Sequence, residues 1–199
     1  MKTFRINTLK SVLNTSFVLL LLTAACGQSG KESKDDTTTS KDSGVVVKAP
    51  EIDLQAAILS DNFEAVEQHI KAGTDIDKKD PMSGSTPLIT AASFGKIKMA
   101  QALIDADADL TLKNNDGSTA LHAAAFLGRV ELVQMLIDAR ADKTTRNNFG
   151  ATARESVMGP FEEVKPIYVM LQQQLGPLGM QLDLKELEKT RPVIAMMLQ

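Results

Sequence analysis

Apolar residues recur at helical spacing in the second half of the chain. Two segments carry such stripes, formed by Ile97, Ala100, Leu103 and Ile104 in one and by Val130, Leu132, Val133, Leu136 and Ile137 in the other. Each follows a shorter apolar run that begins just after Thr86 or Thr119, where a hydroxyl can cap a helix start. These runs end at Gly95 and Gly128, which suit a left-handed helix end. The pattern predicts pairs of short helices.

Many residues recur with a period of 33. The repeated positions are Gly84, Gly117 and Gly150; Thr86, Thr119 and Thr152; Gly95 and Gly128; Leu88 and Leu121; Ala91 and Ala124; and Ala108 and Ala141. Aromatic residues make up only 4% of the chain, which favours helices over strands. Because short helices are marginal alone, such units gain stability by stacking on their neighbours. The period therefore predicts an all-α solenoid.

Aligned at this period, GSTPLITAASFGKIKMAQALIDADADLTLKNND stands over GSTALHAAAFLGRVELVQMLIDARADKTTRNNF. The pair resembles the ankyrin repeat, which has a Gly, a Thr-Pro-Leu-His start, Ala-Ala before a Gly turn, a second apolar helix and a Gly-Ala-Asp exit. The resemblance covers residues 51 to about 174. It implies an ankyrin-repeat solenoid with hairpin-like loops and about four repeats. Their expected bounds are 51–80, 81–113, 114–146 and 147–176, the last being degenerate.

Residues 177–199 follow the repeats and are expected to form a C-terminal helical cap. From Leu182 onward they read as one or two short helices, broken near Thr190-Arg191-Pro192. A solenoid end exposes its last core face and needs a cover. The alternative is a docking helix whose Met196 and Met197 adapt to a partner.

The N-terminal residues have the pattern of an export signal. Basic residues without any acid precede an apolar segment at residues 12–22, which is too short to span a bilayer. The stretch LTAAC, which ends at Cys26, resembles the lipobox of bacterial lipoproteins. That resemblance implies that residues 1–25 are a signal peptide and that Cys26 carries lipid such as palmitate. An ordinary signal peptidase site at Thr23-Ala24-Ala25 is the alternative, and it leaves the cysteine unexplained.

Residues 26–50 join this cysteine to the repeats. They hold mainly Gly, Ser, Thr, Lys and Asp, which cannot bury enough apolar surface to fold, so a disordered tether is expected. Gly27, in place of an aspartate, favours by the same resemblance the periplasmic face of an outer membrane. Removal of residues 1–25 takes the formal net charge from −3 to −6. Charge therefore gives no basis for binding nucleic acid or anionic lipid headgroups.

The two histidines do not indicate an enzyme. His122 occupies the His of the Thr-Pro-Leu-His start, where the ankyrin resemblance implies a structural role in hydrogen bonds between neighbouring loops. Catalysis would need a positioned partner, and His69 lies two repeats away. We find no nucleophile elbow, phosphate-binding loop or zinc motif. The sequence predicts no catalytic residues and no cofactor.

Acidic residues gather at the expected helix exits. They are Asp105, Asp107, Asp109, Asp138 and Asp142. Their spacing matches no EF-hand loop, so we expect solvated turns and no metal site. Asp107 and Arg140 replace the Gly of the ankyrin exit, so each is expected to adopt a left-handed conformation or to force a different turn.

Binding of another protein is the function that the ankyrin resemblance implies, on a concave face made by loop tips and first helices. The candidate contacts are Met82, Ser85, Ser93, Phe94, Asn115, Asp116, Phe126, Leu127, Asn148 and Phe149. Phe149 is the strongest of them, because an exposed aromatic side chain can anchor a partner. Phe94, Phe126 and Leu127 have a second interpretation, as packing between repeats.

We expect a monomer, anchored to a membrane through Cys26, whose partner is a protein. One hypothesis is that it inhibits a secreted or periplasmic hydrolase, as an immunity protein does. The alternative is a scaffold or assembly factor for a periplasmic enzyme, such as an oxidative-stress enzyme.

Overall fold

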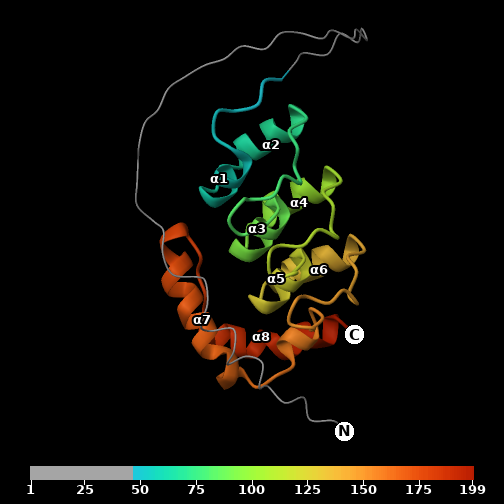
Figure 1. Ribbon diagram of the computed structural model, residues 1–199, viewed down its shortest axis with the longest axis vertical. Helices are drawn as coiled ribbons and strands as arrows, with labels where there is room; N and C mark the ends of the chain where they lie inside the picture. Colours follow the sequence, from blue (N-terminus) through green and yellow to red (C-terminus); the bar gives the residue numbers. More distant parts are fainter. Residues whose placement is uncertain (1–46) are drawn as a thin grey trace. The chain divides into compact units, whose positions relative to one another are not determined.

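Helix pairs follow one another along the chain, as the repeat pattern predicts. The structure is a computed structural model that describes residues 47–199, and this part of the chain contains helices and no strand. The first three pairs are α1 (Leu54–Leu59) with α2 (Phe63–Lys71), α3 (Pro87–Phe94) with α4 (Ile97–Asp105), and α5 (Ala120–Phe126) with α6 (Val130–Asp138). First helices pack on first helices and second helices on second helices (Figure 1). The predicted all-α solenoid is confirmed.

The helix ends use the residues that the repeat pattern singles out. The Thr86 hydroxyl accepts a hydrogen bond from the Ile89 amide at 3.2 Å, and Pro87 lies in the first turn of α3. Gly95 and Gly128 both have a φ of 71°, in the left-handed region. The prediction of short, capped helices with glycine exits is confirmed.

Three residues other than glycine also take the left-handed conformation after a helix: Asp61 after α1, Asp107 after α4 and Arg140 after α6. Asp107 has a φ of 61° and Arg140 a φ of 65°. Asp107 and Arg140 therefore adopt the left-handed conformation, which was one of the two outcomes expected for them, and do not force a different turn. Each costs about 1 kcal/mol relative to glycine, and the stacking of the helices must offset this.

A continuous hydrophobic core runs through the helix pairs. Ala91, Ala92, Ala124 and Ala125 on the first helices are almost completely buried, so these helices can approach closely. The larger members of the core are Ile58, Leu88, Met99, Leu103, Leu121, Leu132 and Leu136. Since each short helix buries its apolar side against neighbours on both sides, stability depends on stacking and not on any single helix.

The fourth repeat departs from the expected bounds of 147–176. In the position of its first helix lies only a 3-10 helix, η2 (Glu155–Val157), which contacts α5. The position of its second helix, against α6 and η2, is taken by α8 (Leu184–Met197). Between η2 and α8 stand α7 (Phe161–Leu175) and η3 (Gly176–Leu178). The fourth pair is therefore split by an inserted segment.

The C-terminal helix covers the end of the solenoid. Ile194 and Leu198 belong to the same hydrophobic core as the repeats, as a terminal cap requires, while Met196 is exposed. The predicted break near Thr190–Pro192 is wrong, because Pro192 lies inside one continuous helix. Burial of Ile194 and Leu198 contributes about 1.5–3 kcal/mol each, which offsets the cost of about 3 kcal/mol of an interior proline.

Contacts with the repeats begin slightly before residue 51. The Gln68 carboxamide donates a hydrogen bond to the Lys48 carbonyl at 2.8 Å, inside the expected tether of 26–50. The predicted signal peptide, Cys26 and the tether up to residue 46 lie outside the described residues. Among residues 47–199, no helix has both the length and the apolar character needed to cross a bilayer.

Candidate functional site

The loop tips are joined by hydrogen bonds that repeat along the solenoid. The Asn115 amide donates to the Ser83 carbonyl at 3.0 Å, and its carboxamide donates to the Met82 carbonyl at 2.8 Å. One repeat later, the Asn148 amide and carboxamide donate to the Asp116 and Asn115 carbonyls, both at 2.9 Å. We call this series, from Met82 to Asn148, the tip ladder. It makes the tips a rigid, pre-organised surface.

Lysine side chains reinforce the loops below the tips. Lys79 donates to the Lys113 carbonyl at 2.7 Å, and Lys113 donates to the Arg146 carbonyl at 3.0 Å. The Arg146 guanidinium turns to the Glu155 carboxylate and the Gly150 carbonyl. This pairing lowers the pKa of Glu155. Arg146, at the end of the third repeat, occupies the position that Lys79 and Lys113 hold in the first two.

The predicted contact residues on the tips differ in what they offer to a partner. Met82 is 77% exposed and Phe149 is 54% exposed, and both are apolar. Asn115, Asp116 and Asn148 are also exposed, but the donors of Asn115 and Asn148 and the carbonyls of Asn115 and Asp116 take part in the tip ladder. Met82 and Phe149 are therefore the tip residues with free apolar surface.

Two predicted serine contacts are partly buried. Ser85 accepts a hydrogen bond at its carbonyl from the Gln55 carboxamide, at 2.9 Å. The Ser93 hydroxyl donates to the Ile89 carbonyl one turn earlier in α3, at 2.8 Å. Both residues serve the fold in this way.

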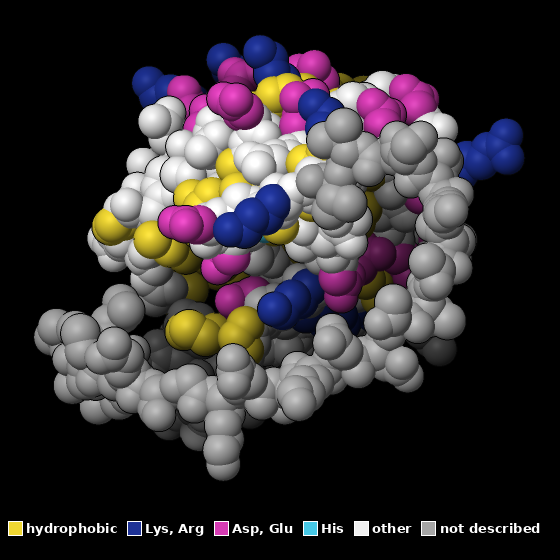
Figure 2. Space-filling model, turned by 90° about the horizontal axis from the view of Figure 1, so that it is seen from above, with side chains coloured by type: hydrophobic (Ala, Val, Ile, Leu, Met, Phe, Trp, Pro, Cys, Tyr) yellow, Lys and Arg dark blue, Asp and Glu magenta, His cyan; other side chains and the backbone are white. Residues whose placement is uncertain are grey.

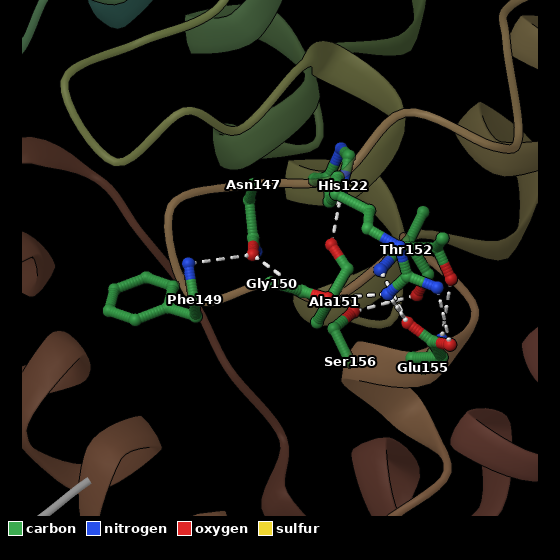
Figure 3. Close-up of polar contacts among 10 residues, drawn as sticks. His122, Asn147, Phe149, Gly150, Ala151, Thr152, Glu155 and Ser156 are labelled. Atoms are coloured by element: carbon green, nitrogen blue, oxygen red, sulfur yellow. Dashed lines mark hydrogen bonds and ion pairs between the residues drawn. The ribbon is translucent and has the colours of Figure 1, made fainter. Parts of the chain in front are cut away.

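Phe149 stands on a turn whose backbone is held in place. The Asn147 carboxamide oxygen accepts hydrogen bonds from the Phe149 and Ala151 amides, each at 3.1 Å. Figure 3 shows the Phe149 ring pointing away from these contacts. A rigid aromatic side chain loses little conformational entropy on binding, so Phe149 has the properties of a binding anchor.

The ends of the first helices are covered by α7. Leu127 is 6% exposed, and Phe126 packs on Tyr168 of α7 with ring centroids 4.8 Å apart. Phe94 is partly buried against the same cluster. Leu127 therefore offers almost no surface to a partner, contrary to expectation, and Phe126 is only partly exposed. The second interpretation, packing, describes them, although the neighbour is the inserted helix α7.

A buried tyrosine and a buried arginine hold α7 in this place, and sequence reasoning missed both. The Tyr168 hydroxyl donates to the Phe126 carbonyl at 2.7 Å and accepts from Arg191 of α8 at 2.8 Å. Arg191 also donates to the Gly159 carbonyl at 3.0 Å. Burial raises the pKa of Tyr168, and Arg191 opposes this. The one available signal was that the chain has a single tyrosine and no tryptophan.

His122 has the structural role expected of it. Its Nδ1 accepts hydrogen bonds from the Thr119 amide at 3.3 Å and hydroxyl at 2.9 Å, which leaves Nε2 to donate to the Ala151 carbonyl at 3.2 Å (Figure 3). The ring thus joins the start of α5 to the next loop tip. Burial, opposed by the hydrogen bond to Ala151, lowers the pKa of His122.

The lowered pKa of His122 predicts a loss of stability in weak acid. Between the folded pKa and the unfolded value of about 6.5, only the unfolded chain binds the proton, so stability rises with pH and is fully present above about 6.5. Thermal unfolding from pH 7.5 to pH 5 should show this decline in the wild type. The slope, at most about 1.4 kcal/mol per pH unit for one proton, should be absent in His122→Gln. Equal slopes in the two proteins would contradict the assignment.

Two of the acidic residues near the helix exits, Asp109 and Asp142, stabilise turns. The Asp109 carboxylate accepts from the Thr111 amide at 2.8 Å, and the Asp142 carboxylate accepts from the Thr144 amide at 2.8 Å. Hydrogen bonds from the Thr144 and Thr145 hydroxyls lower the pKa of Asp142 to about 2. Within residues 47–199, no three His, Cys, Asp or Glu side chains are grouped to hold a metal ion.

The face seen in Figure 2 carries charges of both signs. In the view of Figure 2, acidic and basic side chains lie interspersed and do not form a broad patch of one sign. Between α4 and α6 runs a shallow, open groove lined by Gln101, Ile104, Gln134 and Met135. Among the exposed large apolar side chains, Met82 and Phe149 are the ones that lie on the loop tips.

Comparisons with known proteins agree with the fold. The family described as "Ankyrin repeats (3 copies)" matches residues 54–147, which ends where the fourth repeat departs from the pattern. A similar solved structure is the ankyrin repeat domain of Bcl-3, described as a unique member of the IkappaB protein family. It has 32% sequence identity and a TM-score of 0.50, and the match covers 52% of this chain and 45% of that chain.

The present chain thus spans less than half of the Bcl-3 domain. No curated protein matches the sequence. The helix pairs, the period and both matches agree on one description. Residues 54–147 match the ankyrin-repeat family model and form an ankyrin-repeat solenoid, a fold that indicates a protein–protein interaction module.

Proposed function

We propose that this protein binds a partner protein outside the cytoplasm while a lipid on Cys26 holds it to a membrane. The support for export and anchoring is the sequence before and at Cys26, with its basic start, short apolar segment and lipobox-like end. Two or more acyl chains give stable anchoring, since each buried CH₂ contributes about 0.8 kcal/mol. The periplasmic face of an outer membrane is the proposed location.

The observation that carries the binding proposal is the exposed aromatic side chain of Phe149 on a rigid tip. Met82, on the tip two repeats earlier, is the other exposed apolar side chain at this edge. Because α7 covers the ends of α3 and α5, the proposed contact surface narrows to the tips and the free sides of the first helices.

Inhibition of a hydrolase is the role that we propose for this binding. A pre-organised surface loses little entropy on binding and so favours a tight one-to-one complex, which an inhibitor needs. An inhibitor must abolish the partner's activity in that complex. A scaffold or assembly factor would bind without inhibiting, so an activity assay of the purified complex separates the two roles.

Phe149→Ala should weaken partner binding by more than about 1 kcal/mol, which is roughly a fivefold rise in the dissociation constant. The partner is captured from membranes with the full chain and identified, and its affinity for each variant is then measured by calorimetry. Met158→Ala is the matched control, because Met158 is also 54% exposed but lies between η2 and α7. Unchanged affinity of Phe149→Ala, within about 0.5 kcal/mol, would contradict the proposal.

Cys26→Ser should abolish both lipid labelling and membrane association. Cells fed labelled palmitate should incorporate it into the wild-type chain, which sediments with membranes, whereas the variant should be unlabelled and soluble. The variant keeps the small residues before position 26, so ordinary export remains possible. Equal membrane association of an unlabelled variant would refute lipid anchoring.

A further inference from the structure

The tip ladder ends at the third tip. That tip presents the same backbone acceptors that the first two tips use. Asn115 bonds to two successive carbonyls of the first tip, and Asn148 bonds to two successive carbonyls of the second. In the same register, the third tip presents the carbonyls of Asn148 and Phe149. No donor among residues 47–199 bonds to either of them. The third tip therefore repeats the acceptor pair of the first two without an occupant from this domain.

The glycine of each tip shows the same difference in packing. A β-carbon on Gly84 would overlap the Asn115 carboxamide, and one on Gly117 would overlap the Asn148 carboxamide. Gly150 has the same left-handed conformation, with a φ of 77° against 68° and 71°, but nothing lies within 4 Å of its β-carbon position. The place that an asparagine side chain fills at the first two tips is thus open at the third.

Residues 47–199 of a second copy cannot supply the missing donors without breaking contacts of their own, because the backbone amide of every asparagine in them is already hydrogen-bonded. The Met82 and Ser83 amides of the first tip both donate to the Asp80 carboxylate, at 3.1 and 2.7 Å. The donors of Asn115 and Asn148 are used in the tip ladder. We therefore assign the occupant to a different protein.

We propose that the third tip, Asn148–Phe149–Gly150, receives a turn of the partner protein that carries an asparagine. Its backbone amide donates to the Phe149 carbonyl, its carboxamide donates to the Asn148 carbonyl and lies over Gly150, and an adjacent apolar side chain packs on the Phe149 ring. The partner thereby continues the tip ladder by one step. This inference rests on the proposed binding function and specifies its chemistry.

The test uses a cyclic peptide with the sequence of residues 113–119, KNNDGST, as the probe, because this turn carries the required donors. It is titrated into the isotope-labelled full chain and followed by NMR. We expect saturable shifts centred on residues 148–151, and at least fivefold weaker binding of a peptide with alanine at the second asparagine. Absence of saturable shifts there, or equal binding of both peptides, would overturn the inference.

Gly150→Ala should remove peptide binding, because its β-carbon fills the open place. Gly179→Ala is the matched control: Gly179 is also left-handed, with a φ of 95° and nothing within 4 Å of its β-carbon position, but it follows η3. The inference would be overturned if both Gly150→Ala and Gly179→Ala lost peptide binding to the same extent, or if neither variant lost it. So would sedimentation showing a dimer that Gly150→Ala dissociates, since the occupant would then be a second copy.

The outcome separates this inference from the proposed function. If the captured partner depends on Phe149 but tolerates Gly150→Ala, the protein binds through this edge and the ladder continuation is wrong. The peptide could instead bind and be blocked by Gly150→Ala, while the affinity of the partner is unchanged by Phe149→Ala. The acceptor site would then exist, and the proposed partner surface would be wrong.

Discussion

Tyr168→Ala is expected to lower the free energy of unfolding by about 3–5 kcal/mol, the usual cost of removing a large buried aromatic side chain. Tyr168 is 0% exposed and lies against Phe126 and Phe161, with ring centroids 4.8 and 5.9 Å away. Its hydroxyl also joins α5 to α8 through Phe126 and Arg191. Its loss therefore removes both the ring packing and the polar link that hold α7. Urea unfolding followed by circular dichroism measures the change.

Tyr168→Phe separates the two contributions. The ring stays, but the Phe126 carbonyl and the Arg191 guanidinium each lose a partner, which costs about 1–3 kcal/mol. Val169→Ala is the control on the same helix, because Val169 is 38% exposed and an exposed change should stay within about 0.5 kcal/mol. If Tyr168→Ala behaved like Val169→Ala, α7 would not be held against the solenoid as the structure places it.

The repeat structure could be predicted from the sequence because its signals are local. A threonine before an apolar run starts a helix, and a glycine about eight residues later ends it, so Thr86 and Gly95 bound α3 closely. The period then shows that the same unit recurs and must stack. For Asp107 and Arg140, comparison with the glycine expected at the same position left two outcomes, a left-handed conformation or a different turn, and the first is observed.

The C-terminal region could not be predicted because it contains no second copy for comparison. Nothing local indicates that Tyr168 reaches Phe126, which lies 42 residues earlier, or that α7 separates η2 from α8. Pro192 even gives the wrong local signal, since an interior proline normally ends a helix. Packing of distant residues decides these features, and the helix continues because Ile194 and Leu198 reach the core.

The candidate site also contains features that could be predicted from the sequence and features that could not. The exposure of Phe149 could be anticipated, because the repeat pattern puts that position at a loop tip. The burial of Leu127 could not, because its neighbours come from the inserted segment. The acceptor pair at Asn148 and Phe149 was equally hidden, since a hydrogen-bond register is visible only in three dimensions.

Gly117→Ala is expected to cost about 2–4 kcal/mol, against about 1 kcal/mol for Gly150→Ala. Both substitutions strain a left-handed residue by about 1 kcal/mol. Only the alanine at 117 also meets Asn148, because its β-carbon would overlap the carboxamide and lie 2.8 Å from the backbone nitrogen. Displacing Asn148 removes two hydrogen bonds, each contributing about 0.5–1.5 kcal/mol. The difference in chemical unfolding between the two variants therefore measures one step of the tip ladder.

The double variant Gly117→Ala with Asn148→Ala tests this assignment. Because Asn148→Ala removes the side chain that the new β-carbon overlaps, the two changes should be less than additive. Full additivity, or equal costs at 117 and 150, would mean that Asn148 moves aside freely and that the ladder step contributes no stability. The acceptor pair of the third tip has the same geometry as that of the second. In that case it would not be expected to favour an asparagine-bearing turn either.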